Sequence, residues 1–377
     1  MLKIYTILIK LYKTDIKTNY IALLYIKWQY NGKLKIFVLI LLKEGDDYSE
    51  ISEYIRFRMN VDRNINQSIR KSFGKALLQA GELNENVVVL DSDLSCSTQT
   101  KMFADKFPNR FFNCGIAEQN MIATAAGLAS QGKVPFAATF AMFATGRTYD
   151  QIRNGVCYSD LNVKIVGTHG GITVGEDGAT HQALEDIALM REIPHMTVIV
   201  PADARECEEV IKYASVHDGP MYIRISRCNV PDIFDESYHF NIHKAVTVED
   251  GCDVTVFTNG ELLAECILAS HELKKLGIST RVVNVPVVKP IDKITVINCA
   301  KETKFLITVE NHSTIGGLGS AICETVCNTS PTKVYRIGIH DEFGQSGKSD
   351  ELVKYYGLDS ESLVKRIVSM YKKEVNA

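Results

Sequence analysis

From Asn64 onward, short runs of β-branched residues alternate with longer stretches of helical periodicity, and this alternation constrains the fold more than any other feature of the sequence. Apolar runs of four or five residues separated by helices are typical of parallel strands buried on both faces. The runs form two groups, and a chain of 377 residues with 46% hydrophobic side chains can fill two cores. We therefore predict an α/β protein of two domains, each a mostly parallel sheet flanked by helices.

The first group contains predicted strands at 87–90, 134–138, 163–167, 197–200 and 221–225, with helices at about 66–81 and 117–130. The second contains strands at 254–258, 280–285, 305–309 and 333–337, with helices at about 262–276, 318–326, 352–356 and 360–371. Between them, residues 226–243 show little periodicity and include a proline, which indicates a linker. The predicted domains are 59–240 and 241–377.

Residues 1–43 differ from the rest of the chain, because they contain eight lysines and a single acidic residue, Asp15. Their unbroken apolar runs do not exceed seven residues, whereas a spanning helix needs about 20. They also lack the apolar core and cleavage site of a secretory signal, and a basic interfacial helix stays open. We predict that residues 1–58 are an atypical extension and hypothesise a translated leader, with Met59 as the natural start; mass spectrometry of the native N-terminus would decide.

The charge balance and the cysteines exclude several classes of protein. Lys+Arg 42 against Asp+Glu 45 gives a net charge of -3, which does not indicate a nucleic-acid or membrane partner, and we expect a cytoplasmic protein. The 10 cysteines include no CxxC pair and no zinc spacing. We therefore expect reduced core thiols and no metal ligands in this chain.

Functional groups of open α/β sheets lie on loops beyond the carboxyl ends of the strands. The first domain has five such loops rich in polar or aromatic residues, at 91–97, 115–120, 139–143, 168–181 and 226–227. The second domain has none as dense. The Gly317–Gly319 pair lacks the third glycine of a dinucleotide fingerprint, and Gly170–Gly175 lacks the lysine of a P-loop, so neither supports a nucleotide enzyme.

Two of these loops carry ionisable groups that suit catalysis. Glu118 opens a helix with an apolar body, where a buried carboxylate needs a donor or a proton, although an acidic residue at a helix start also simply favours the dipole. His169, Asp177 and His181 share one glycine-rich stretch and suit proton transfer and polyhydroxylated substrates. Their spacing does not suit zinc. Phe140 and Phe143, three apart, are equally compatible with a core.

Together these motifs resemble the transketolase family, specifically its pyrimidine-binding and C-terminal domains, from residue 66 to about 366. The motifs that carry the resemblance are GIAEQN at 115–120, TFAMF at 139–143, THGGITVGEDGATHQ at 168–182, PADARE at 201–206 and DEFGQSG at 341–347. The long segment from His169 to His181 is the most specific of them. GIAEQN is shared with 1-deoxyxylulose-5-phosphate synthases.

The resemblance implies thiamine diphosphate as cofactor and assigns residues to it. Glu118 would hydrogen-bond N1′ of the aminopyrimidine and so activate the cofactor, Phe140 and Phe143 would stack on that ring, and Asp93 would lie near the thiazolium. Gly146 stands where the family often has a third aromatic residue, which leaves that wall of the pocket thinner.

For the substrate, the resemblance places His169 and His181 beside the carbonyl and hydroxyls of the donor sugar as catalytic residues, with Asp177 at a donor hydroxyl. The residues implied to hold the phosphate are Arg70, Ser97, His169 and Arg227, and arginine pairs phosphate bidentately. The implied reaction transfers a two-carbon glycolaldehyde unit from a ketose phosphate to an aldose phosphate, with pentose phosphates as the default substrates.

Family members bind the diphosphate through Mg2+ on a GDG motif, and no GDG occurs in this sequence. The resemblance therefore implies a partner, an N-terminal transketolase subunit that holds the Mg2+, in a heterotetramer. This chain would then be the C-terminal subunit of a split transketolase, inactive alone. Three alternatives stay open: a 1-deoxyxylulose-5-phosphate synthase, the β subunit of a 2-oxoacid dehydrogenase, and a non-catalytic partner that kept the fold.

Overall fold

The computed structural model describes residues 3–13, 20–30, 33–41 and 66–375, which belong to two compact units, 1–56 and 57–377. In the first unit, β1 (Lys3–Lys13), β2 (Tyr20–Tyr30) and β3 (Lys33–Leu41) form an antiparallel sheet in that order. These residues therefore do not form the interfacial helix that the sequence left open. Met59, the hypothesised start of the chain, lies outside the described residues.

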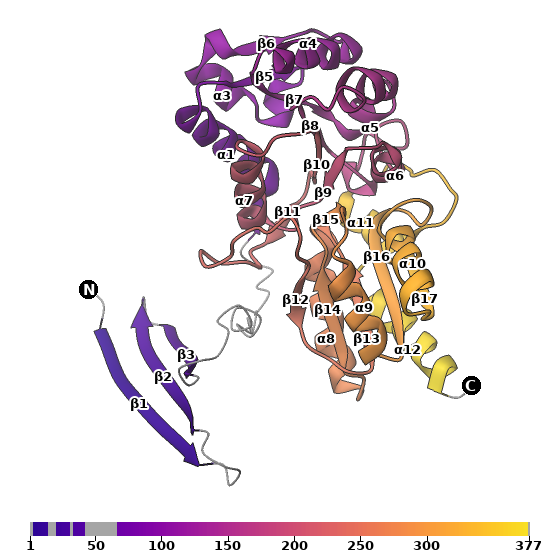
Figure 1. Cartoon of the computed structure of the whole chain (residues 1–377). Coiled ribbons are helices and arrows are strands. Elements are labelled where there is room, and N and C mark those ends of the chain that lie inside the picture. Colours follow the sequence, from indigo (N-terminus) through magenta and orange to yellow (C-terminus); the bar gives the residue numbers. More distant parts are fainter. Residues whose placement is uncertain (1–2, 14–19, 31–32, 42–65, 376–377) are drawn as a thin grey trace. The chain divides into compact units, whose positions relative to one another are not determined.

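The second unit contains a seven-stranded sheet of order β15-β9-β10-β8-β7-β5-β6 (Figure 1). Its strands are β5 (Val87–Asp91), β6 (Phe111–Asn113), β7 (Val134–Phe140), β8 (Lys164–Thr168), β9 (Thr197–Ile199), β10 (Met221–Ile225) and β15 (Val287–Lys289). All are parallel except β15, which pairs antiparallel with β9. This edge strand comes from the second sequence domain, so the two domains share a sheet.

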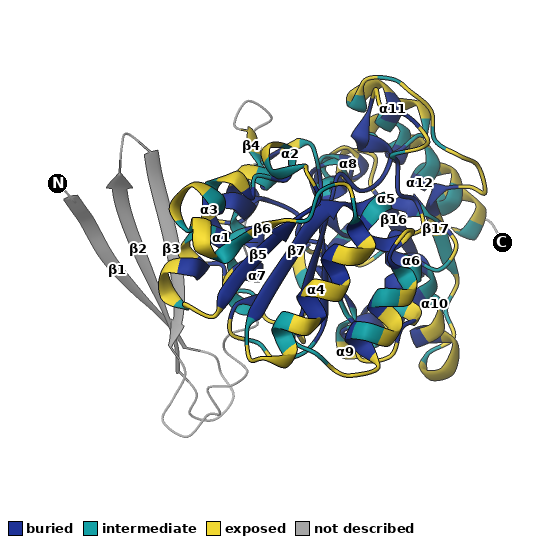
Figure 2. Ribbon diagram, turned by 90° about the horizontal axis from the view of Figure 1, so that it is seen from above, coloured by how far each residue is buried: buried dark blue, intermediate teal, exposed yellow. Residues whose placement is uncertain are grey.

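Helices cover both faces of this sheet, which explains why its strands are apolar throughout. Val87 and Val89 of β5 pack with α1 (Ile69–Leu83) and α7 (Ala204–Ala214), whereas Val88 and Leu90 pack with α4 (Glu118–Ser130) on the other face. Figure 2 shows the buried strands beneath helices whose outer sides are exposed. The same faces carry α3 (Lys101–Lys106), α6 (Asp186–Glu192) and η3 (Gln151–Cys157).

A second sheet has the order β12-β14-β13-β16-β17. Its strands are β12 (Val246–Glu249), β13 (Val254–Thr258), β14 (Thr280–Asn284), β16 (Phe305–Ser313) and β17 (Val334–Ile339), all parallel except β12. The helices on its two faces are α8 (Leu263–Lys275) with α12 (Ser360–Val375), and α9 (Lys293–Glu302) with α10 (Leu318–Thr329). The predicted fold class, two mostly parallel sheets flanked by helices, is confirmed.

The remaining elements are short and connect the sheets. They are α2 (Ser95–Thr98), α5 (Ala141–Thr145), α11 (Ser349–Tyr355), β4 (Asn66–Ser68), β11 (Asn229–Pro231) and the turns η2 (Pro108–Arg110), η4 (Ile172–Val174) and η5 (Gly260–Leu262). The predicted linker 226–243 is well packed, since β11 pairs with β4 and the side chains of Ile233, Phe234 and Tyr238 are buried in the second core.

The sequence analysis expected all the cysteines to lie in the cores, but several of them do not. All ten are free thiols; Cys157, Cys207, Cys266 and Cys299 are buried, but Cys96, Cys252 and Cys327 are exposed, and for these three the expectation of a core thiol is wrong. Among the described residues, none of the helices has both the length and the hydropathy to cross a membrane.

Lys164 begins β8 with a fully buried side chain, and its Nζ donates to the carbonyls of His217 and Gly219 at 2.8 and 2.7 Å. Burial lowers the pKa of this lysine to about 7, partly opposed by the nearby Asp218 carboxylate. The amine therefore satisfies two carbonyls of the loop between α7 and β10, and charging it in this apolar setting costs free energy.

We predict that the pH dependence of stability reports on Lys164. Between about pH 7 and pH 10 the unfolded chain carries the extra proton and the folded chain does not, so stability rises with pH, by at most about 1.4 kcal/mol per unit. The variant Lys164→Met should lose this rise. Urea denaturation of both proteins at pH 7 and pH 9 measures it, and parallel pH dependences would contradict the prediction.

Candidate active site

The polar loops predicted from the sequence lie together at the carboxyl edge of the seven-stranded sheet, because β5, β7, β8 and β10 run parallel and end on the same side. The helix α4 begins at Glu118, as predicted, and the Glu118 side chain is only 6% exposed. The apolar body of α4 is buried on one face, while Ala123, Thr124 and Gly127 on the other face are exposed.

Glu118 is paired with a residue that the sequence analysis did not single out. Arg147 donates from Nη1 to Oε1 of Glu118 at 2.8 Å, and its guanidinium carbon lies 4.2 Å from the centre of the Phe143 ring. The Arg147 side chain is 51% exposed. A flat, charged group therefore bridges the buried carboxylate and an aromatic face beside an open depression of about 440 Å³ next to Glu118 and Arg147.

Four rings form a cluster on the loops after β7 and β8. Phe140 and Phe143 stack with their centroids 5.7 Å apart and an interplanar angle of 16°. The His169 ring lies 3.9 Å from the Phe140 ring, and the His181 ring meets the edge of Phe143 at 5.3 Å. Phe140 is buried, as expected if it were a core residue. Both phenylalanines also contact the rings of the two histidines.

His169 is held in an uncommon backbone conformation, with φ 61°, and is almost fully buried. Its Nδ1 lies 2.9 Å from the Thr168 hydroxyl. Burial, and then the charges of Arg70 and Arg227, lower the pKa of His169 to about 3. The imidazole is consequently neutral at physiological pH, with one nitrogen able to donate a hydrogen bond and the other to accept one.

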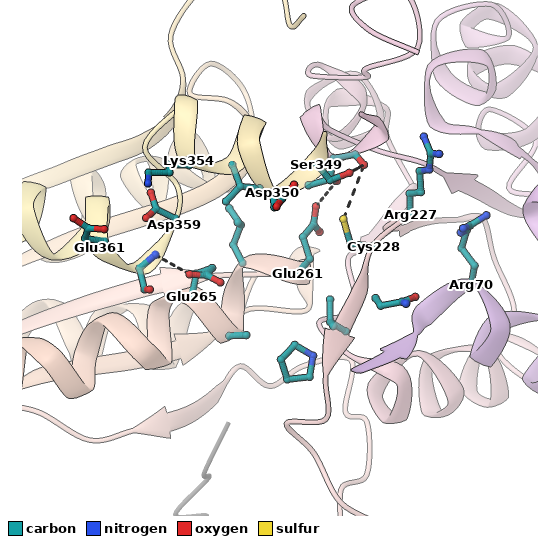
Figure 3. Close-up of a pocket in the computed structure, with 18 residues that line it drawn as sticks. Arg70, Arg227, Cys228, Glu261, Glu265, Ser349, Asp350, Lys354, Asp359 and Glu361 are labelled. Atoms are coloured by element: carbon teal, nitrogen blue, oxygen red, sulfur yellow. Dashed lines mark hydrogen bonds between the residues drawn. The ribbon is translucent and has the colours of Figure 1, made fainter. Parts of the chain in front are cut away.

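Two guanidinium groups lie at one end of a cavity of about 930 Å³ between the sheets (Figure 3). Arg70 donates to the Ser97 carbonyl at 2.8 Å, while its buried Nε has no hydrogen-bond partner. Burial, and then the charge of Arg227, lower the pKa of Arg70. Two neighbouring cations, one of them with an unsatisfied donor, suit an anionic group such as phosphate.

Asp177 and Asp93 each contact another residue of the chain. The Asp177 carboxylate lies 3.6 Å from Nη1 of Arg227, which also donates to the Val174 carbonyl, so an anion at Arg227 would compete with this carboxylate. Asp93 is exposed on the loop after β5 and is hydrogen-bonded with Asn113. The structure thus brings together the predicted residues other than Asp93.

Sequence reasoning missed Arg147, which lies beyond the end of α5 and bonds a carboxylate 29 residues earlier in the chain. The sequence analysis dismissed Gly317–Gly319 as a nucleotide site, and a side chain of the chain itself lies at this helix start. The Glu310 carboxylate fills that helix start, accepting from the backbone amides of Leu318 and Gly319 at 2.7 and 2.9 Å. Residues 66–375 contain no group of three or more His, Cys, Asp or Glu side chains that could hold a metal ion.

Comparison with known proteins identifies the fold. The model of the transketolase pyrimidine-binding domain matches residues 66–232, and that of the transketolase C-terminal domain matches residues 243–363. A putative transketolase C-terminal section of Methanocaldococcus jannaschii is 51% identical over 311 residues, 82% of this chain and 98% of the relative. A 6-deoxy-6-sulfo-D-fructose transketolase subunit of Clostridium is 40% identical over 297 residues, 79% and 92% of the two chains.

Among solved structures, a split-gene transketolase described as an inactive β4 tetramer is 44% identical with a TM-score of 0.75, covering 83% of this chain and 99% of that one. A pyrimidine-binding domain followed by this C-terminal domain defines a thiamine-enzyme architecture. The chain belongs to the transketolase family.

The residues at Glu118 fit the aminopyrimidine that this family implies. The Arg147 guanidinium indicates which kind of group fits beside Glu118. This planar, N–H-donating group lies against the Phe143 ring and donates to the Glu118 carboxylate. A protonatable aromatic ring would meet the same two surfaces, the acceptor on one side and the ring face on the other.

We predict that His169 does not titrate in the physiological range. Because burial and two arginines keep the imidazole neutral, its ring signals in a ¹³C-His NMR titration should keep constant shifts between pH 5 and pH 8. The variant His169→Asn identifies the signals. A midpoint within that range would contradict the prediction.

We also predict that Glu118 and Arg147 are energetically coupled. Arg147→Met leaves a buried carboxylate without its donor and should lower the free energy of unfolding by about 1–2 kcal/mol. In a double-mutant cycle with Glu118→Gln, the coupling should be about 1 kcal/mol. Urea denaturation of the four proteins measures it, and additive effects would show that the pair is not coupled.

Proposed function

We propose that this chain is the C-terminal subunit of a thiamine-diphosphate-dependent transketolase, which transfers a two-carbon glycolaldehyde unit from a ketose phosphate to an aldose phosphate. The observation that carries the proposal is the placement of Glu118 opposite Phe143, beside the ring cluster of Phe140, His169 and His181. When bound, thiamine diphosphate supplies the electron sink that this chemistry needs.

The chain's own residues have separate tasks in this proposal. Glu118 exchanges the Arg147 guanidinium for the ring nitrogen of the cofactor, and its burial strengthens that single hydrogen bond. Phe140 and Phe143 orient the ring by stacking. The neutral His169 accepts or donates a hydrogen bond at the donor sugar without adding charge.

Arg70 and Arg227 bind the terminal anion of the sugar at the end of the cavity, where Arg70 has a donor without a partner. Binding there requires Arg227 to exchange its contact with Asp177 for the ligand. The released Asp177 carboxylate can then accept a bond from a donor hydroxyl. Because phosphorylated sugars do not cross membranes unaided, we place the reaction in the cytoplasm.

The partner in this proposal is an N-terminal transketolase subunit that holds Mg2+ and the diphosphate, in a heterotetramer. Two relatives support a separate subunit, since the matched regions cover 98% of a C-terminal section and 99% of a chain from a split-gene transketolase. The description of the latter as an inactive β4 tetramer agrees with a subunit that needs its partner. Asp93, exposed on the loop after β5, would lie near the thiazolium when the cofactor is bound.

A second donor is worth testing because of one relative. The Clostridium subunit is named for 6-deoxy-6-sulfo-D-fructose, and a terminal sulfonate, like a phosphate, is an anion that paired guanidinium groups bind. The two arginines therefore support a ketose with a terminal anion. They do not by themselves distinguish phosphate from sulfonate.

We predict that the chain releases glyceraldehyde 3-phosphate from xylulose 5-phosphate and ribose 5-phosphate only when a GDG-containing N-terminal subunit, thiamine diphosphate and Mg2+ are added. Glu118→Ala should lower turnover by about 10²-fold or more, because the cofactor loses its activating carboxylate. Glu192→Gln, an exposed acid outside the site, serves as the control.

Size-exclusion chromatography must show that every tested complex is assembled. If an assembled wild-type complex turns over neither the phosphate nor the sulfonate donor, the sugar-transfer proposal is refuted. The chain would then be the β subunit of a 2-oxoacid dehydrogenase or a non-catalytic partner. Equal turnover by the Glu118→Ala complex would refute the role of Glu118.

A further inference from the structure

The loop that carries His169 and Asp177 has an uncommon backbone. Besides His169 at φ 61°, the residues Gly171, Gly175 and Gly178 have positive φ values between 73° and 85°. Such a sequence of left-handed residues is costly in entropy and persists only where surrounding contacts hold it. Several of those contacts come from the second domain.

Asn311, at the end of β16 in the second sheet, reaches across the domain boundary into this loop. Its Oδ1 accepts from the backbone amide of Ile172 at 2.9 Å, and its Nδ2 donates to the Thr173 hydroxyl at 3.0 Å. The Asn311 side chain is buried. One side-chain amide thus satisfies a backbone donor and orients a hydroxyl of a segment 138 residues earlier in the chain.

Glu261 completes the arrangement from η5, also in the second domain. The Thr173 hydroxyl donates to its Oε1 at 3.0 Å, and the Asn311 amide donates to the same oxygen. Ser349, at the start of α11, donates to the Thr173 carbonyl at 2.8 Å. Thr173 is therefore held on both its side chain and its backbone by C-terminal residues, and Glu261 and Ser349 line the cavity of Figure 3.

The loop packs closely against the second domain. A Cβ at Gly171 would lie 2.3 Å from the Asn311 amide group, closer than carbon atoms approach each other. At the far end of the loop, the Gln182 side chain donates to the Gln345 carbonyl at 2.9 Å, within the DEFGQSG segment. The C-terminal domain consequently fixes the backbone position of the loop. Steric contact prevents the loop from moving toward this domain, and moving away from it would break the hydrogen bonds.

We propose that Asn311 and Glu261 are positioning residues for the donor sugar, which fix the 170–175 segment and through it the placement of His169 and Asp177. The sequence analysis placed none of the candidate site residues in the C-terminal domain. In this inference, which rests on the proposed function, the domain forms the outer support of the donor-sugar site, whereas Glu118 and the stacked phenylalanines stand apart from it.

The test compares three variants of the full chain, each assembled with the N-terminal subunit, thiamine diphosphate and Mg2+. Asn311→Ala removes the side-chain amide of the bridge, and Glu261→Ala removes the oxygen that accepts from Thr173 and Asn311. Arg191→Ala is the matched control, because Arg191 also crosses the domain boundary, donating to the Gly316 carbonyl at 2.8 Å, but does not touch the loop.

For Asn311→Ala we expect the KM for the ketose donor to rise about tenfold, the effect of losing one or two buried hydrogen bonds, with an unchanged Kd for thiamine diphosphate. Glu261→Ala should raise the KM in the same direction, because the shared accepting oxygen is lost, and Arg191→Ala should stay within about twofold of the wild type. Such a split supports the inference, since general damage to the fold would weaken donor and cofactor together. A wild-type donor KM in Asn311→Ala would overturn it.

Hydrogen exchange of the full chain alone gives a readout that does not depend on the reaction. Amides 170–175 should exchange faster in Asn311→Ala than in the wild type or in Arg191→Ala, with unchanged exchange in β5 and β7. Unchanged exchange at 170–175, or acceleration spread over the whole sheet, would overturn the inference. If the assembled wild-type complex turns over no donor, the proposed function fails, and the exchange result alone decides whether Asn311 holds the loop.

If Asn311→Ala does not fold, Ser349→Ala replaces it, since this change removes the bond to the Thr173 carbonyl, together with a contact to the Cys228 thiol, from a half-buried position. The expected result is a smaller acceleration of exchange at 170–175, about two- to fivefold, the effect of one neutral hydrogen bond. Exchange equal to that of the wild type would again count against the inference.

Discussion

The buried guanidinium of Arg224, on β10, is the interaction on which the geometry of this molecule most depends. Its Nε donates to the Asp186 carboxylate at 2.8 Å, and its Nη2 donates to the carbonyls of Ala183 and Asn311 at 3.2 and 2.9 Å. A single side chain therefore connects a strand of the first sheet, the end of the loop that carries the two histidines, and a strand of the second sheet. A buried ion pair adds little net stability, but its fixed directions define how these three segments meet. Gly170 passes so close to this guanidinium that a Cβ there would lie 2.3 Å from Nε.

Around Arg224, the charged groups of the candidate site form two separate sets. The neutral imidazole of His169 lies between the aromatic stack and the two arginines, and burial, together with those arginines, keeps it neutral. Glu118 lies at the start of a different helix, where Arg147 rather than His169 compensates its charge. The arginine pair and the Glu118 carboxylate are thus separate charged groups with separate partners. In the proposed function, a ligand at one of them need not change the charge at the other.

The fold class and most of the site follow from local patterns. The strand β10 was predicted with its observed bounds and β13 likewise, because runs buried on both faces are apolar throughout and end at turn residues. The amphipathic helix α7 was missed, although Asp203 caps it by accepting from the Glu206 amide, since its apolar positions are separated by charged ones. The strand β15 could not have been predicted as an edge of the first sheet, because it comes from the second domain and its pairing with β9 is a long-range contact.

What the sequence by itself determined is the order of strands and helices, the start of α4 at Glu118, and the set of side chains gathered on the loops after parallel strands. These depend on periodicity, on turn residues and on motifs, all of which are local. Only the tertiary structure decided that Arg147 compensates Glu118, that Asp177 pairs with Arg227, and that Asn311 supports the histidine loop. Each of these contacts joins segments far apart in the chain or depends on a side-chain direction. Such contacts arise from the packing of whole elements, and no local pattern records them.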